Sequence, residues 1–140
     1  MPSEKYATVT WMDELRFDAE AGVGHQHITL DGAGLTGQSP MDLLLTGLAG
    51  CTGMDVISIL RKMRQEVTGL RIEVRGRRAE EHPKVYTDVT IEFVVTGHGV
   101  QEESVRRAIE LSETKYCSVG ATIAKTARIT STFRIEEAGA

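Results

Sequence analysis

The chain has two cysteines, Cys51 and Cys117, and the residues around each could support thiol chemistry. Cys51 lies in the small-residue segment 49–54, inside a stretch with the composition of a buried apolar helix. Cys117 opens a second helix-like stretch, residues 117–124. A thiol at a helix N-terminus lies at the positive end of the helix dipole, which favours the nucleophilic thiolate. From helix placement alone, Cys117 is therefore expected to be the more activated thiol.

Two thiols that meet in a fold can carry out a redox cycle. A thiolate attacks one oxygen of a peroxide and becomes a sulfenic acid, and a second thiol condenses with that acid to form a disulfide. Cys51, within an apolar helix, suits a hydrophobic peroxide, whereas Cys117 suits a reactive or resolving thiol. The competing interpretation is that both are small buried hydrophobic side chains, which is common for free cysteine.

Other site chemistries have weaker support in the sequence. His25 and His27 lie two residues apart on an expected strand and so share a face, which is the smallest chelating unit. No acidic or cysteine pattern beside them completes a known metal-ligand set. The chain also lacks the short motifs of serine hydrolases, zinc proteases, dinucleotide-binding proteins and phosphate-binding loops. We therefore expect no metal and no cofactor.

Length, cysteine content and charge limit the class of protein. The 140 residues suit a single domain, residues 1–140, and two cysteines are too few for a secreted disulfide framework. The net charge is -4 with both signs mixed along the chain, which argues against a nucleic-acid partner. The N-terminus shows no apolar signal segment, and residues 41–60 are too polar for a membrane span. A cytoplasmic protein without a membrane partner is expected.

The elements that must position the thiols begin with short strands. Alternating apolar and polar residues predict an antiparallel meander over residues 6–11, 15–20 and 25–31. A helix should then begin at Ser39 and Pro40 and run to about residue 65, because serine is a good N-cap and proline fits the first helical position. Asp42 at the third helical position completes a shortened capping box.

Three glycines interrupt this helix at regular spacing. Gly47, Gly50 and Gly53 recur every three residues, and each costs about 1 kcal/mol relative to alanine in a helix interior. The close approach of another helix, or of a ligand, would offset that cost.

The rest of the chain predicts a hairpin, two helices and a last strand, over residues 69–79, 85–95, 101–113, 117–127 and 128–135. The element order is therefore βββ-α-ββ-αα-β. Strands grouped in this way, rather than alternating strictly with helices, indicate an α+β fold. We expect antiparallel sheets wrapped around the long central helix that carries Cys51.

Several segments resemble the OsmC/Ohr family of osmotically induced and organic hydroperoxide resistance proteins. They are Ser-Pro-Met-Asp-Leu-Leu-Leu at 39–45, Leu-Ala-Gly-Cys-Thr-Gly-Met-Asp-Val at 48–56 and Lys-Tyr-Cys-Ser-Val at 115–119. The resemblance covers nearly the whole chain, including the element order and the spacing of the cysteines. It is greatest to the YhfA-like branch, which has a similar Gly-His-Gln, here 24–26, and a similar Asp-Val-Ile-Ser-Ile-Leu, here 55–60.

The resemblance implies an intertwined homodimer with two active sites at the subunit interface. It also implies thiol-dependent reduction of organic hydroperoxides, with a small-molecule or lipoyl dithiol as the reductant. Cys51 would match the attacking, peroxidatic cysteine and Cys117 the resolving one. The resemblance thus reverses the roles that helix placement alone suggested.

This sequence departs from the family pattern at two charged positions. The classical enzymes have a glutamate just after the helix-start proline, where this chain has Met41 followed by Asp42. They also have an arginine in the strand before the loop, whereas residues 25–31 contain none. Without that arginine the thiolate loses its main electrostatic partner. His25 or His27 is a candidate substitute.

Three hypotheses follow from these observations. The first is a peroxide-stress enzyme in which Cys51 attacks an organic hydroperoxide and Cys117 resolves the sulfenic acid. The second is a non-catalytic dimer that holds a small apolar ligand, with inert or regulatory cysteines. The third is a metal- or thiol-sensing role for His25 or His27 together with a cysteine.

Overall fold

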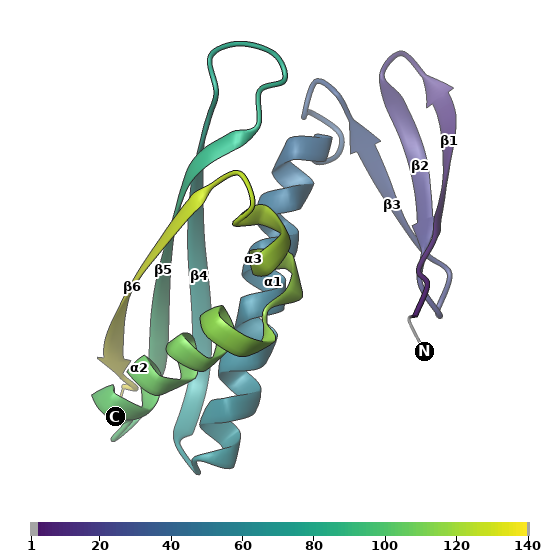
Figure 1. Cartoon of the computed structure of the whole chain (residues 1–140). Coiled ribbons are helices and arrows are strands. Elements are labelled where there is room, and N and C mark those ends of the chain that lie inside the picture. The colour runs from purple at the N-terminus through teal and green to yellow at the C-terminus, as the bar shows by residue number, and fades with distance from the viewer. Residues whose placement is uncertain (1–2, 140) are drawn as a thin grey trace. The chain divides into compact units, whose positions relative to one another are not determined.

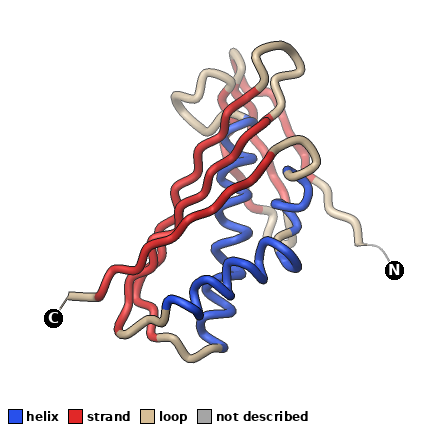
Figure 2. Tube along the Cα trace, turned by 60° about the vertical axis from the view of Figure 1, so that its left-hand side comes forward, coloured by secondary structure: helices blue, strands red, loops and turns tan. Residues whose placement is uncertain are grey.

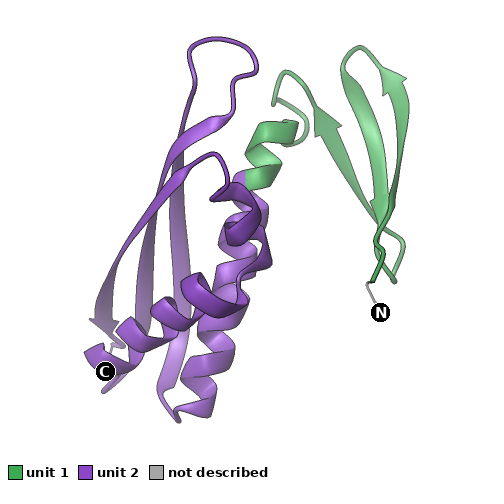
Figure 3. Ribbon diagram, viewed as in Figure 1, with its two compact units in different colours: residues 1–44 green, residues 45–140 purple. Residues whose placement is uncertain are grey.

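The computed structural model describes residues 3–139 and has the predicted element order (Figure 1). The elements are β1 (Ala7–Asp13), β2 (Arg16–Ala21), β3 (Gln26–Asp31), α1 (Pro40–Lys62), β4 (Glu66–Arg78), β5 (Tyr86–His98), α2 (Glu102–Leu111), the π-helical turn η1 (Ser112–Tyr116), α3 (Ser118–Ile123) and β6 (Arg128–Glu137). The chain divides into two compact units, one ending at Leu44 and one beginning at Leu45 (Figure 3). The α+β class is confirmed.

The first unit contains the predicted antiparallel meander, in the order β1-β2-β3. The register places Val9 opposite Ala19 and Ala19 opposite Ile28, so one face of this sheet is apolar. The other face carries Asp18 and Glu20. Val9 and Ile28 are nevertheless exposed, so the rest of the first unit does not cover this apolar face.

The loop after β3 is organised by one buried carboxylate, Asp31. It accepts hydrogen bonds from the backbone N–H groups of Ala33, Leu35 and Thr36 and from the Thr36 hydroxyl. The Thr36 and Ala33 backbone N–H groups contribute most to lowering the pKa of Asp31, which falls to about 2. The Asp31 carboxylate therefore provides hydrogen-bond acceptors for the backbone N–H groups of this loop.

The predicted strand over residues 25–31 is one residue too long. β3 begins at Gln26, and His25 has a left-handed backbone with φ of 52°. The reason is a tight turn, in which the His25 N–H donates to the carbonyl oxygen of Gly22 at 3.1 Å. His25 therefore belongs to the turn rather than to the strand ladder.

Helix α1 begins with the predicted capping box. The Asp42 N–H donates to Ser39 Oγ, and the Ser39 N–H donates to Asp42 Oδ2, both at 3.2 Å. By length and composition α1 is apolar enough to cross a membrane, so the expectation that residues 41–60 are too polar to do so was wrong. The buried side chains of α1 nevertheless make it a core helix of the second unit. Its buried residues recur every four positions: Leu48, Thr52, Val56 and Leu60.

The second unit is a β4-β5-β6 sheet with helices on one face (Figures 1 and 2). Four alternating residues of the central strand β5 are buried: Val89, Ile91, Phe93 and Val95. β4 and β5 form the predicted antiparallel hairpin, but β5 and β6 pair in parallel, so the expectation of purely antiparallel sheets was wrong. The reason is the long connection through α2, η1 and α3, since a helical crossover returns the chain in the same direction.

The glycines of α1 meet different surroundings within the described chain. A Cβ added at Gly53 would lie 2.8 Å from Ile72 Cδ1, so close approach to strand β4 explains this glycine. Gly47 and Gly50 have nothing within 4 Å of such a Cβ among residues 3–139. The predicted close contact is thus found at one of the three positions, and it is with a strand rather than with a helix.

Candidate functional site

The structure brings the two cysteines together. The sulfurs of Cys51 and Cys117 and a carboxylate oxygen of Asp55 all lie within 4.8 Å of one another. Cys51 and Asp55 share a face of α1 because they are four residues apart. Cys117 is the N-cap residue of α3, and it is buried, whereas the other two are half-buried. Both cysteines are free thiols, so the pair is close without being bonded.

The π-helical turn η1 directly precedes Cys117 and places it beside Cys51 and Asp55. The Cys117 N–H donates to the Ser112 carbonyl oxygen at 2.8 Å, which closes the wide turn. Such turns are rare and are frequently found at functional sites. In this case the turn also carries Ser112 and Glu113, the first toward Asp55 and the second into a cavity beside Cys117.

A relay of two buried hydroxyl groups fixes the Asp55 carboxylate. Ser112 Oγ donates to Asp55 Oδ2 at 2.9 Å and lies 2.8 Å from Thr52 Oγ1. A serine hydroxyl has one proton, and Ser112 gives it to the carboxylate, so Thr52 donates to Ser112. Thr52 is 2% exposed and Ser112 is 0% exposed, so each hydroxyl depends on this chain for its hydrogen bonds.

The environment of Cys117 opposes its ionisation. Burial, the neighbouring Cys51 and the negative charge of Asp55 raise the pKa of Cys117 to about 11. The Gly120 N–H donates to Cys117 Sγ at 3.2 Å and lowers the pKa, but it does not offset the loss of water. The prediction that the start of a helix activates Cys117 was therefore wrong, because desolvation outweighs the helix N-terminus.

The acidic group of the site has no cationic partner in the described chain. None of the ion pairs formed among residues 3–139 involves Asp55. The two thiols thus face a carboxylate rather than the arginine that the family pattern supplies. This charge arrangement keeps the Cys117 thiol protonated and suits a bound cation.

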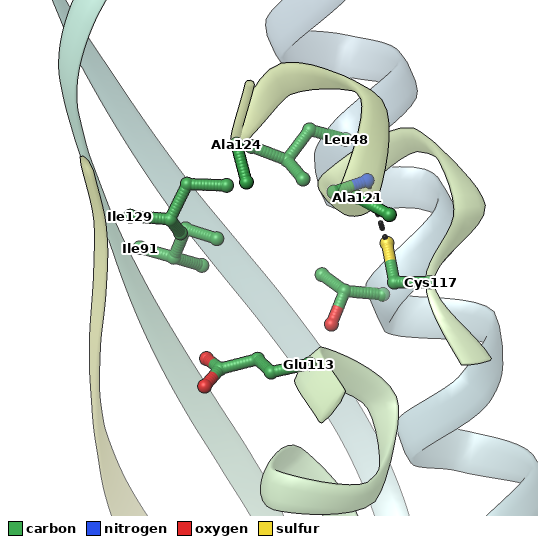
Figure 4. A pocket seen from close by; sticks show the side chains of 9 residues that line it. Leu48, Ile91, Glu113, Cys117, Ala121, Ala124 and Ile129 are labelled. Atoms are coloured by element: carbon green, nitrogen blue, oxygen red, sulfur yellow. Dashed lines mark hydrogen bonds between the residues drawn. The ribbon is translucent and has the colours of Figure 1, made fainter. Parts of the chain in front are cut away.

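A mostly apolar cavity of about 220 Å³ adjoins Cys117 (Figure 4). Its apolar wall includes Leu48, Ile91, Ala121, Ala124 and Ile129. Glu113 supplies the one carboxylate of the lining and accepts a hydrogen bond from Ser131. The cavity can hold a small apolar group with a polar end next to the sulfur.

The other candidate residues lie in the first unit, where each has its own partner. Asp42 is held by the capping box with Ser39. His25 Nδ1 lies 2.8 Å from Glu20 Oε2, and His27 Nδ1 lies 3.0 Å from Asp18 Oδ2. The hydrogen bond and negative charge of Asp18 raise the pKa of His27. A supporting role for Asp42, His25 or His27 in thiol chemistry stays a prediction.

Sequence reasoning missed Asp55, Ser112 and Glu113. The four-residue spacing of Cys51 and Asp55 was a usable signal, because it places both on one helix face. Ser112 and Glu113 had no such signal, since an ordinary continuation of α2 would orient both side chains differently.

Comparison with known proteins gives the class of protein. The model of the OsmC-like protein family matches residues 31–132. This chain therefore belongs to the OsmC-like family. It is 38% identical over 130 residues to Protein YhfA of Escherichia coli K12, a match that covers 92% of this chain and 96% of YhfA.

Solved structures agree with this assignment. A hypothetical protein from Aquifex aeolicus is 31% identical with a TM-score of 0.89, covering 99% of this chain and all of that one. An OsmC-like protein from Mycoplasma pneumoniae has a TM-score of 0.82 at 17% identity, covering 96% and 99% of the two chains. The organic hydroperoxide resistance protein OhrB of Bacillus subtilis has a TM-score of 0.63 at 14% identity, over 94% and 98%. The last two likenesses show the fold alone.

Proposed function

We propose that this protein is a thiol-dependent organic hydroperoxide reductase that acts in defence against peroxide stress. Membership of the OsmC-like family and the fold shared with organic hydroperoxide resistance proteins support this function. The observation that carries the proposal is the approach of Cys51 and Cys117, whose sulfurs lie within 4.8 Å of each other. A short movement then suffices to form a disulfide.

In the proposed cycle, Cys51 attacks and Cys117 resolves. The Cys51 thiol and the hydroperoxide ROOH give the Cys51 sulfenic acid and the alcohol ROH, as the O–O bond breaks and the S–O bond forms. The Cys117 thiol then displaces the hydroxyl group, which gives the disulfide and water. A small-molecule or lipoyl dithiol returns two electrons and two protons to the pair.

The raised pKa of Cys117 supports this assignment of roles. A thiol with a pKa of about 11 stays protonated near neutral pH and is a poor first nucleophile. In the second step its proton must reach the leaving hydroxyl group. Asp55, within 4.8 Å of both sulfurs, can relay that proton as a general base and acid.

The cavity beside Cys117 supports an apolar substrate. Its aliphatic lining and its volume of about 220 Å³ suit the organic group of a small hydroperoxide. Hydrogen peroxide has no organic group to place there. We therefore expect a preference for alkyl over hydrogen peroxide.

The functional unit in this proposal is a cytoplasmic homodimer. The exposed apolar residues of the first sheet, including Val9, Trp11 and Ile28, support a partner surface. The open space beside Gly47 and Gly50 of α1 supports it as well. In this proposal the second copy covers both surfaces.

A dithiol-coupled assay with cumene hydroperoxide tests the function. Wild-type protein should consume the peroxide, and Cys51→Ser should abolish turnover. Cys117→Ser is the matched control, because it keeps the attacking thiol and should form a sulfenic acid once without turning over. Reduced, folded wild-type protein that consumes no peroxide would refute the proposal.

The same assay tests the residues of the first unit. If His25, His27 or Asp42 supports the thiolate, its replacement by Gln or Asn should slow turnover while the fold is retained. Unchanged turnover in all three variants would remove them from the site.

The second candidate function is the binding of a small apolar ligand without turnover. The observation that favours it is the combination of a mostly apolar cavity with a thiol whose pKa is raised. Native mass spectrometry of fresh protein separates the two functions. A retained ligand supports binding, whereas loss of the two thiol hydrogens after peroxide treatment supports the redox pair.

A further inference from the structure

We propose that Cys51, Asp55 and Cys117 form a binding site for a single zinc ion. The three ligand atoms, two sulfurs and one oxygen, lie within 4.8 Å of one another. The site requires no hydroperoxide turnover, so the proposal holds or fails separately from the reductase function.

The distances suit a tetrahedral ion. With Zn–S bonds of about 2.3 Å and Zn–O bonds of about 2.1 Å, tetrahedral ligand atoms lie about 3.5–3.8 Å apart. The ligand atoms here are at most 4.8 Å apart, so small rotations of the side chains bring them to an ion. Three protein ligands also leave a fourth position for water or a small ligand, as in catalytic zinc sites.

The chemistry of the ligands selects among metals. Calcium and magnesium prefer all-oxygen sites, whereas thiolates favour zinc and other soft or borderline ions. Two thiols with one carboxylate, supplied by Cys51, Cys117 and Asp55, therefore fit zinc better than an alkaline-earth ion.

Charge gives an independent reason for a cation here. Asp55 forms no ion pair among residues 3–139, and residues 25–31 contain no arginine where the family pattern has one. Zn²⁺ binds the two thiols and the carboxylate with the release of two protons, which leaves a net charge of about -1 at the site. The ion thus supplies the positive charge that the described side chains do not.

The surroundings of Asp55 suit a ligand of fixed orientation. Ser112 Oγ donates to Asp55 Oδ2 and is itself held by Thr52, so the carboxylate is oriented by two buried hydroxyl groups. Hydrogen bonds of this kind to metal-binding carboxylates orient the ligand and tune its affinity. Ser112 does not donate to Oδ1, the other carboxylate oxygen of Asp55.

Zinc and the disulfide exclude each other, because both use the sulfurs of Cys51 and Cys117. Bound zinc should therefore slow oxidation of the pair, and disulfide formation should expel the ion.

Metal titration of the reduced, tag-free full chain tests the site. Wild-type protein should bind one Zn²⁺ per chain in competition with a chromophoric chelator. Co²⁺ at the same site should give a thiolate-to-cobalt charge-transfer band and the visible bands of a tetrahedral ion. Cys51→Ala and Cys117→Ala should each weaken zinc binding roughly 100-fold, and Asp55→Asn roughly tenfold.

Glu110→Gln is the matched control, since it removes an exposed carboxylate of α2 that pairs with Arg107. Its zinc affinity should equal that of the wild type. Zinc binding that is absent from folded, reduced wild-type protein, or equally tight in the three site variants, would overturn the proposal. The cobalt spectrum and the affinities do not depend on peroxide turnover, so an inactive protein that binds zinc would refute only the reductase.

Discussion

The two units of this chain hold their candidate groups in opposite ways. In the first unit, His25 and His27 are exposed and paired with Glu20 and Asp18. In the second, the thiol pair and Asp55 are buried or half-buried, and the carboxylate accepts a hydrogen bond from Ser112 but forms no ion pair among residues 3–139. Exposed charges that neutralise each other gain little from any further partner. A buried thiol beside a half-buried carboxylate that lacks an ion-pair partner gains more from a bound ion than such exposed pairs do.

The same contrast holds for the hydrophobic residues. The second unit contains all the buried apolar residues of the described chain, and many of them lie on β5. The strands of the first unit bury only Asp31, although one face of their sheet is apolar. The second unit therefore has a core of its own, whereas the first depends on packing that its own sheet does not supply.

The largest effect is expected from a substitution in the hydrophobic core of the second unit. Phe93 is 0% exposed at the centre of β5, so Phe93→Ala should lower the free energy of unfolding by about 3–5 kcal/mol. Chemical denaturation with far-UV circular dichroism measures this change. Val23→Ala, at a fully exposed position of the first unit, is the control and should have almost no effect. Equal losses for the two variants would remove the contrast between the units.

Much of this fold could be predicted because local signals and tertiary packing agree. The alternation of β5 between Val89 and Val95 and the capping box of Ser39 and Asp42 are both present in the structure. The pairing direction of β6 was not predictable in the same way. The alternation of apolar and polar residues in β6 is compatible with parallel and with antiparallel pairing. The helical crossover before β6 determines that the pairing is parallel.

Of the candidate site, the sequence analysis identified only the two cysteines. Their resemblance to family motifs singled out Cys51 and Cys117, but no spacing rule reveals a distance between segments far apart in sequence. The effect of burial on Cys117 also needs the packed structure, because a helix start and a desolvated pocket shift a thiol pKa in opposite directions. Cys117 meets Cys51 and Asp55 only when the start of α3 is placed beside α1.

The second prediction concerns the exposed apolar face of the first sheet. If a second copy covers that face, Ile28→Lys should disrupt the dimer, because a lysine there would be buried without a partner. A cost of about 2 kcal/mol from each copy weakens dimerisation roughly 1,000-fold. Light scattering coupled to size-exclusion chromatography measures the mass. Thr10→Lys, on the opposite face of the same sheet, should leave the dimer intact. A wild-type protein of single-chain mass would contradict the prediction.

The third prediction concerns the hydroxyl relay of the second unit. Ser112→Ala should lower the free energy of unfolding by about 1–3 kcal/mol, because Thr52 and Asp55 lose a buried hydrogen-bond partner. Ser118→Ala, at an exposed serine on α3, is the matched control and should change stability by less than about 0.5 kcal/mol. A loss as small for Ser112→Ala would show that water replaces the missing hydroxyl.

The smallest expected effect lies in the exposed histidine cluster of the first unit. The pKa of His27 is raised above its usual value of 6.5, first by the hydrogen bond that its ring donates to Asp18 and less by the charge of Glu20. Because the folded state holds the proton more tightly, this stabilisation is fully present below pH 6.5. It is lost as the pH rises through the folded pKa. His27→Gln should remove this small decline in thermal stability.

Asp18 raises the pKa of His27 more than Glu20 does, and this difference can be measured. NMR titration of the His27 ring should show a lower pKa in Asp18→Asn than in Glu20→Gln, because Asp18 both accepts the hydrogen bond and lies closer to the ring. Salt should reduce the shift, since the cluster is exposed and its charges are screened. A larger effect from Glu20→Gln would mean that His27 turns toward Glu20 in solution. His27 would then have no fixed ion-pair partner, and the histidine cluster would differ less from the thiol site than the structure indicates.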